Sequence, residues 1–331
     1  MMKRIAILIF MVIFCWGCST SKSQFVGIKN YIRGEHYLQA HNYGKGLTTF
    51  EKEVLINPDN AGAHYYLGRF ALAEKKQKKG LKHLKRAVEL SPGNADFHFW
   101  LGVAYSANTA PEEERRSYLL ALSLDKDHVQ ALIYLGHNQF ERKAYREAIA
   151  NYSRALKLSP DDPQALYNRA FILRVFQRTP EEIEAWMAYL EYYPTGALAR
   201  NAVEYLNKNG NFEYRNYLIG NRTVSLKKIR FEPFTTTLKE ESLTSLDFVG
   251  YLMTKYRDFI LHIIVFQKNN VQLAKSRALS IKNYITEKNP KIPYSQIKTS
   301  WFGEVERLQY DRKTYTLGSS VQLFTEHAQS K

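Results

Sequence analysis

A period of thirty-four residues runs through the first half of the chain. Small residues recur at this interval at one position, and proline recurs at a second position, where Lys126 takes one of the places. The small-residue series comprises Gly34, Gly68, Gly102, Gly136 and Ala170, and the proline series comprises Pro58, Pro92, Pro160 and Pro194. A fixed period of this length indicates stacked repeats that bury their apolar faces against one another. We therefore predict five units, at residues 27–60, 61–94, 95–128, 129–162 and 163–196.

Each unit is predicted to contain two antiparallel helices. A second small position holds Gly46, Gly80 and Ala148, and a large residue follows it four positions later, at Phe50, Leu84, Tyr118, Tyr152 and Trp186. A small residue is needed where two helices cross closely, and a large apolar residue fills the space beside the crossing. Proline then stands where the second helix has ended and cannot continue.

This pattern resembles the tetratricopeptide repeat family over residues 27–196, and "LARNAVEYLNKNG", from Leu198 to Gly210, resembles the helix that closes such arrays. The predicted fold of residues 27–210 is thus an α-helical solenoid of five repeats and a capping helix. The resemblance implies a superhelix whose concave side is lined by the first helix of each unit, with Tyr31 and Glu35 as inward positions in the first. It places a groove for a partner protein at Tyr65, Arg69, Phe99, His137, Phe140, Tyr167, Phe171 and Arg174.

The aromatic residues of this groove have an alternative interpretation as core. Aromatic side chains at helical spacing are more often core than ligand contacts, but here the repeat motif already fills the core positions. We therefore expect an extended or helical peptide to bind against them. The carboxylate clamp known in the family needs a set of Lys, Asn and Arg residues, and Asn168 is only an isolated candidate for it.

The first eighteen residues have the composition of a signal segment. Lys3 and Arg4 precede an uncharged run at residues 5–16, which is too short to span a bilayer, and Gly17 and Cys18 follow. A small residue before a cysteine resembles the lipobox of bacterial lipoproteins, although Cys15 and Trp16 depart from the usual pattern. The resemblance implies a lipid on Cys18, cleavage of residues 1–18 and a tether at residues 19–26.

The predicted location is the periplasmic face of the outer membrane, because Ser19 stands where an aspartate marks inner-membrane retention. Ordinary secretion and an uncleaved anchor are the alternatives. The two cysteines of the chain, Cys15 and Cys18, both lie in this segment. The rest of the chain therefore offers neither a disulfide nor a cysteine-based metal site.

The repeat period stops at Asn211, and residues 211–331 alternate between strand and helix patterns. We predict a strand within residues 222–238, an amphipathic helix after it, and a buried strand at residues 258–266. A second helix is predicted at residues 271–287, with strands at residues 297–302 and 321–324. This order favours a small α/β sandwich with helices over one sheet.

Three segments of this region resemble the OmpA-like peptidoglycan-binding domain, over residues 226–325. They are "IRFEPFTTTL", "LAKSRALSIKNYI" and "WFGEVE". In that family an arginine and a strand-end aspartate grip the diaminopimelate of the cell-wall peptide. Arg277 falls on the arginine, but Lys268 stands near the place of the aspartate. Peptidoglycan is therefore a doubtful partner, and Arg277 is either a surviving carboxylate site or a solvated helix arginine.

Charge and motifs narrow the function to binding. The formal net charge is +15, which favours acidic surfaces or polymers over nucleic acid, because no known nucleic-acid module accompanies it. No catalytic motif, cofactor loop or metal-binding helix motif is found, and His64, His98 and His137 are interpreted as helix-face residues. Two hypotheses remain: a non-enzymatic scaffold or assembly factor of an envelope complex, and an anchor that links the outer membrane to the cell wall.

The lipid anchor depends on the Cys18 thiol. We expect Cys18→Ser to yield a soluble or unprocessed protein, because serine offers no thiol for acylation. Membrane fractionation with a size assay checks this. Membrane retention of a fully processed Cys18→Ser protein would contradict the prediction.

Overall fold

The computed structural model describes residues 29–256, 258–310 and 312–327. The predicted signal segment, Cys18 and the tether therefore lie outside the described residues. The chain forms two compact units, with the boundary after Pro160. The fifth predicted repeat and the capping helix are grouped with the α/β region in the second unit, and the predicted domain boundary at Gly210 stays a prediction.

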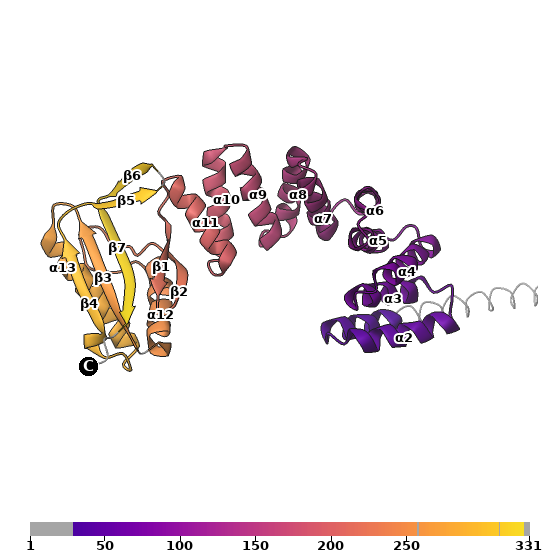
Figure 1. Ribbon diagram of the computed structural model, residues 1–331, viewed down its shortest axis with the longest axis horizontal. Coiled ribbons are helices and arrows are strands. Elements are labelled where there is room, and N and C mark those ends of the chain that lie inside the picture. The colour runs from indigo at the N-terminus through magenta and orange to yellow at the C-terminus, as the bar shows by residue number, and fades with distance from the viewer. Residues whose placement is uncertain (1–28, 257, 311, 328–331) are drawn as a thin grey trace, which may run out of the picture. The chain divides into compact units, whose positions relative to one another are not determined.

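The helices recur with the period predicted from the sequence (Figure 1). In the first unit residues 29–39 are helical, followed by α2 (Tyr43–Ile56), α3 (Ala61–Ala73), α4 (Gln77–Leu90), α5 (Ala95–Ala107), α6 (Pro111–Leu124), α7 (Val129–Glu141) and α8 (Tyr145–Leu158). In the second unit the helical part comprises α9 (Pro163–Val175), α10 (Thr179–Tyr192) and α11 (Ala197–Lys208). The predicted helix pairs are confirmed in the described residues.

Four of the helix pairs have a capping residue before their first helix, and five have a turn with positive φ between their two helices. The side chain before α3, α5, α7 and α9 accepts a hydrogen bond from a backbone N–H of the first turn, at Asn60, Asn94, His128 and Asp162. The turn between paired helices contains a residue with positive φ, at His41, Lys75, Thr109, Lys143 and Gln177. This second series was not predicted, because none of its residues is a glycine or an asparagine, the types that most often adopt positive φ.

The predicted pairing of small and large residues is confirmed in three of the pairs. A Cβ atom on Gly68 would lie 2.5 Å from the side chain of Leu84. At Gly102 the same atom would lie 2.4 Å from the Tyr118 ring, and at Gly136 it would lie 2.8 Å from the Tyr152 ring. Gly34 differs, because its nearest neighbour is the Tyr66 ring of α3. Glycine therefore lets the large side chain of the second helix pack directly on the backbone of the first.

The α/β region contains more strands than the sequence pattern predicted. Its elements are β1 (Tyr214–Ile219), β2 (Arg222–Lys227), α12 (Glu240–Lys255), β3 (Phe259–Gln267), α13 (Val271–Lys288), the 3₁₀ helix η1 (Tyr294–Gln296), β4 (Ile297–Phe302), β5 (Glu306–Tyr310), β6 (Lys313–Leu317) and β7 (Ser319–His327). The strand predicted within residues 222–238 ends at Lys227. Pro233 lacks an N–H and Phe234 has a φ of 58°, so the ladder cannot continue through this segment.

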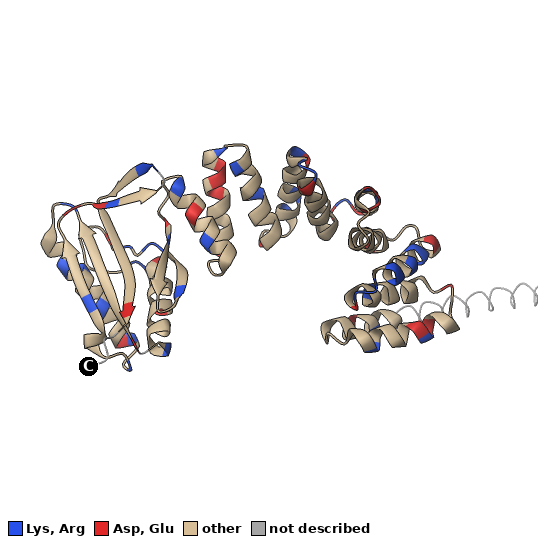
Figure 2. Ribbon diagram, in the orientation of Figure 1, with Lys and Arg blue, Asp and Glu red and all other residues tan. Residues whose placement is uncertain are grey.

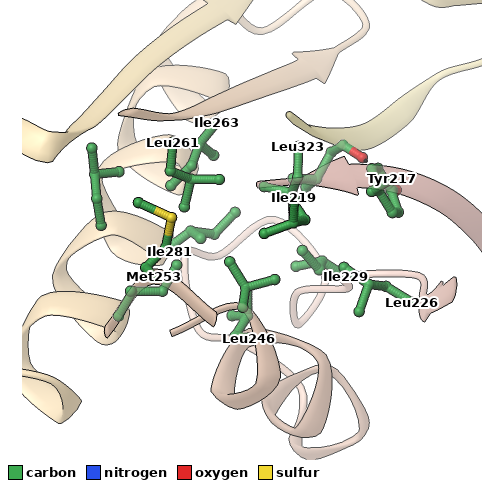
Figure 3. Close-up of a cluster of buried hydrophobic side chains, with 14 of the residues drawn as sticks. Tyr217, Ile219, Leu226, Ile229, Leu246, Met253, Leu261, Ile263, Ile281 and Leu323 are labelled. Atoms are coloured by element: carbon green, nitrogen blue, oxygen red, sulfur yellow. Dashed lines mark hydrogen bonds between the residues drawn. The ribbon is translucent and has the colours of Figure 1, made fainter. Parts of the chain in front are cut away.

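The strands form three hydrogen-bonded sheets instead of the predicted single sheet. In the central sheet β3 pairs in parallel with β4 and antiparallel with β7, while β1–β2 and β5–β6 are antiparallel hairpins. The first hairpin meets β7 through side chains, since the Tyr217 hydroxyl donates to the Val321 carbonyl at 3.1 Å. Figure 3 shows Leu261 and Ile263 of β3 in a common core with Met253 of α12 and Ile281 of α13.

Buried polar contacts join α11 to the strands of the second unit. The Asn207 side chain is 1% exposed and donates to the carbonyls of Asn211 at 2.9 Å and Tyr214 at 2.8 Å. Its oxygen accepts from the Tyr310 hydroxyl of β5 at 2.9 Å. Because every polar atom of this amide is used, the capping helix is fixed to the strands that follow it.

A buried ion pair holds β1 to β5. The Arg215 guanidinium donates through Nη1 to Glu306 Oε2 at 2.9 Å and through Nη2 to Glu306 Oε1 at 2.8 Å. The Glu306 side chain is 1% exposed. A bidentate pair of this kind fixes orientation as well as distance, so it sets the position of the β5–β6 hairpin.

The close crossing at Gly136 can be tested by overpacking. We expect Gly136→Leu to lower the free energy of unfolding by at least about 1 to 3 kcal/mol, because the new side chain must displace the buried Tyr152 ring. Gly93→Leu is the matched control, since a Cβ there has nothing within 4 Å. Thermal melts of both variants check this, and equal melting temperatures would contradict the proposed crossing.

Candidate partner-binding site

A pocket of about 510 Å³ lies in the first unit, on the first helices of three consecutive pairs, and Gln130 of α7 in the fourth pair also lines it. The helix at residues 29–39 contributes Tyr31 and Glu35, α3 contributes Tyr65, Tyr66 and Arg69, and α5 contributes Asp96, Phe97, Phe99 and Trp100. Three of the eight groove residues predicted from the sequence therefore line one pocket, at Tyr65, Arg69 and Phe99. Trp100 was missed because the carried-over inward positions do not include it.

Arg69 organises the polar side of this pocket. Its Nη1 donates to Glu35 Oε1 at 3.1 Å and to the Tyr65 hydroxyl at 3.0 Å. Its guanidinium carbon lies 4.2 Å from the centre of the Trp100 ring. Hydrogen bonds and ring contacts together hold a planar guanidinium in one orientation, so Arg69 is part of the wall of the pocket.

A second polar contact fixes Asp96 at the rim. His128 Nδ1 accepts from the Ala131 N–H, so in the neutral ring the proton is on Nε2, which donates to Asp96 Oδ1 at 3.1 Å. This hydrogen bond lowers the pKa of the Asp96 carboxyl. The Asp96 side chain is 65% exposed, so an ionised carboxylate remains open to a ligand. The capping role of His128 could have been predicted, because His128 lies in the same position of the 34-residue repeat as Asn60, Asn94 and Asp162.

The aromatic residues of the pocket divide into core and open positions. Tyr65 is 8% exposed and its ring stacks on Phe97 at 4.8 Å, while Phe99 is 4% exposed and its ring centre lies 5.1 Å from that of His128. Tyr65 and Phe99 are therefore mostly core residues, in agreement with the alternative interpretation from the sequence. Tyr31 is 62% exposed and gives the pocket an open aromatic edge.

The other five predicted groove residues do not line this pocket. His137 and Phe140 lie on α7, with ring contacts to Tyr152 and Tyr145 respectively. Tyr167, Phe171 and Arg174 lie on α9 in the second unit. There the Arg174 guanidinium carbon lies 4.1 Å from the centre of the Tyr205 ring. A role for these five residues in partner binding stays a prediction.

Arg277 is not a solvated arginine, because it is 6% exposed on the buried face of α13. Its Nε donates to the Thr235 carbonyl at 2.9 Å, and its Nη1 donates to Gln267 Oε1 at 2.6 Å. Further bonds reach Ser319 Oγ and the Glu232 carbonyl. Burial lowers the pKa of its guanidinium. Arg277 therefore holds the loop before α12 against the ends of β3 and β7.

The histidines singled out in the sequence have structural contacts. His64 Nε2 donates to the Pro58 carbonyl at 2.9 Å, and His98 Nε2 donates to the Pro92 carbonyl at 2.8 Å. His64 Nδ1 then accepts from His83 Nδ1 at 2.9 Å. Burial, with His64 and Lys82 beside it, lowers the pKa of His83 to about 4. Among the described residues no group of three or more His, Cys, Asp or Glu is placed to hold a metal ion.

Comparisons with known families identify the repeats. Residues 32–95 and 78–129 match a model described as tetratricopeptide repeat, and residues 136–173 match a second model described as TPR repeat. No curated protein matches the chain.

Several solved structures are similar to about half of the chain. PilF from Pseudomonas aeruginosa is 17% identical, with a TM-score of 0.51 over 57% of this chain and 84% of that chain. PilW, described as a widely conserved type IV pilus biogenesis factor, is 16% identical, with a TM-score of 0.49 over 55% of this chain and 86% of that chain. YrrB, described as a TPR protein with an unusual peptide-binding site, is 16% identical, with a TM-score of 0.44 over 51% and 87%. We conclude that the chain carries an array of tetratricopeptide repeats followed by a small mixed α/β region.

Proposed function

We propose that the protein is a non-enzymatic outer-membrane lipoprotein that holds a partner protein of a periplasmic envelope complex. The observation that carries this proposal is the pocket of the first unit, which the first helices of consecutive pairs build from aromatic side chains and fixed charges. The matching family models describe repeats and no enzyme. Repeat arrays use surfaces of this kind to bind peptides and proteins.

The chemistry of the pocket favours a partner segment with a basic side chain. Glu35 already accepts hydrogen bonds from Arg69 and from the Tyr66 hydroxyl. Asp96 accepts a hydrogen bond from His128 alone among the described side chains, and it keeps acceptor positions toward solvent. A lysine or arginine of the partner can pair with this carboxylate while its methylene groups cover the aromatic edge at Tyr31.

The membrane location rests on the lipobox resemblance at Cys18. None of the helices that the structure describes combines the length and the apolarity needed to cross a bilayer. Two acyl chains supply enough buried CH₂ groups for stable attachment, at about 0.8 kcal/mol for each group. A lipid anchor would leave both units free to work in the periplasm.

The wall-anchor function is the second candidate, favoured by the LAKSRA segment of α13 that contains Arg277. Four hydrogen bonds from Arg277 to neutral protein acceptors argue against it, because a diaminopimelate carboxylate would have to replace them. Lys268 adds to this difficulty, since its exposed ammonium would repel the amino group of the same ligand. We therefore place peptidoglycan binding second.

Site-specific photo-crosslinking tests the scaffold function. We expect a photoreactive phenylalanine analogue at Tyr31 to form a discrete protein adduct in envelope fractions. The same analogue at Leu55 of α2, which is 83% exposed, is the control and should form none. Asp96→Asn keeps an acceptor for His128 but removes the charge, so it should reduce the adduct at Tyr31. Equal adducts at both positions, unaffected by Asp96→Asn, would contradict the proposal.

Sedimentation with cell-wall sacculi separates the two candidate functions. We expect the purified chain to stay mostly in the supernatant with diaminopimelate-type sacculi at physiological salt. Any pelleting should fade as salt is raised, because screening weakens nonspecific charge attraction. Salt-resistant pelleting that free diaminopimelate-containing peptide competes away would favour the wall-anchor function instead.

A further inference from the structure

The β2 strand has a free edge. It belongs to a two-stranded sheet in which β1 is its partner, with the Gly220–Asn221 turn between them. In an antiparallel pair, backbone groups point alternately toward the partner strand and away from it. Lys228 N donates to the Glu213 carbonyl at 2.7 Å, so every second residue before Lys228 also faces β1. The alternate residues of β2, including Thr223 and Ser225, direct their N–H and C=O groups away from β1.

Two side-chain bonds agree with this register. Ser245 Oγ of α12 donates to the outward carbonyl of Lys227 at 3.2 Å. On the opposite edge of the hairpin, Thr325 Oγ1 of β7 donates to the Leu218 carbonyl at 3.4 Å. One end of the free edge is thus covered by α12, whereas Thr223 and Ser225 have no backbone partner on that side among the residues that the structure describes.

A groove runs along this edge within the second unit. Two pockets, of about 540 Å³ and 470 Å³, share Thr195, Ser225 and Phe248 in their linings. The first is bounded by the start of α11, by β2 and by the end of α12, and the second continues toward the end of α10. Thr223 and Ser225 of β2 therefore border a groove that these two pockets form along the strand.

The larger pocket is positively charged. Arg200, Arg222 and Lys255 line it, and no aspartate or glutamate does. In the part of the chain that the structure describes, none of these three side chains forms an ion pair. Figure 2 marks basic residues on β2 and at the end of α12. The three cations of the larger pocket, which lies beside the strand edge at Thr223, favour an anionic ligand there.

We propose that an extended acidic segment of a second partner protein adds as a third strand to the free edge of β2. A strand matches the alternating donors and acceptors of this edge, which a lipid headgroup or a simple anion cannot do. Acidic side chains of the segment then pair with Arg200, Arg222 and Lys255. This site lies in the second unit and is independent of the pocket in the first, so the protein has two docking sites.

A peptide probe tests the proposal with the full chain. The probe is a fluorescent seven-residue peptide of alternating glutamate and valine, and the control is the same peptide N-methylated at every residue. Methylation keeps the charge and removes the strand hydrogen bonds. We expect it to weaken binding by about tenfold or more, as the loss of one or two hydrogen bonds predicts. Equal affinities would overturn the proposal, because they would show charge attraction alone.

Variants locate the site on the protein. Thr223→Pro removes an outward N–H without disturbing the bonds to β1, and Thr223→Val is its control. We expect the proline variant to lose about tenfold in affinity and the valine variant to bind normally. Should the proline variant fail to fold, Arg222→Glu replaces it, with Lys291→Glu as a control of equal charge change on an exposed lysine outside the groove. Equal weakening by both charge reversals, or unchanged binding by a folded Thr223→Pro, would overturn the proposal.

Discussion

The contact of a large side chain with a glycine backbone is the interaction on which the helical array depends. Tyr118 and Tyr152 are fully buried against Gly102 and Gly136, and Leu84 takes the same place against Gly68. Burying a large apolar side chain contributes roughly 1.5 to 3 kcal/mol, and the same contact recurs from pair to pair. Because the crossing is close, each first helix is held at a fixed distance from its second helix. That distance brings the first helices of neighbouring pairs together around the candidate pocket.

Polar residues then give the pocket its fixed charges. Arg69 is held by Glu35, Tyr65 and Trp100, which come from three different helices. His128 caps α7 and binds Asp96 of α5, so one ring both starts a helix and fixes an acidic group at the rim. Contacts between successive helix pairs thus determine which charges face a ligand, and a single repeat could not present them.

The sequence predicted the helical part closely because its period is set by packing at every repeat. It predicted two helices and four strands of the α/β region, which correspond to α12, α13, β2, β3, β4 and β7, but it missed β1 and the β5–β6 hairpin. These elements are held by polar contacts between distant residues, such as Arg215 with Glu306 and Asn207 with Tyr310. Local patterns carry no information about such pairs.

The candidate site was only partly predicted, because it also depends on contacts between residues that are distant in the sequence. Tyr65 and Arg69 occupy inward positions that the family resemblance supplies, whereas Asp96 and Trp100 lie outside those positions. His128 follows the series of capping residues, which was not recognised in the sequence. Burial of Arg277 could not be predicted either, because its acceptors come from a loop and two strand ends that meet only in the fold.

In the proposed scaffold, the first unit binds its partner through the Asp96 rim of the pocket. Once a partner has been isolated, a double-mutant cycle between Asp96→Asn and each basic residue of the bound partner segment measures the pairing directly. We expect a coupling energy of about 1 kcal/mol or more for one such residue. Coupling energies near zero for every basic residue, with partner affinity unchanged in Asp96→Asn, would contradict it.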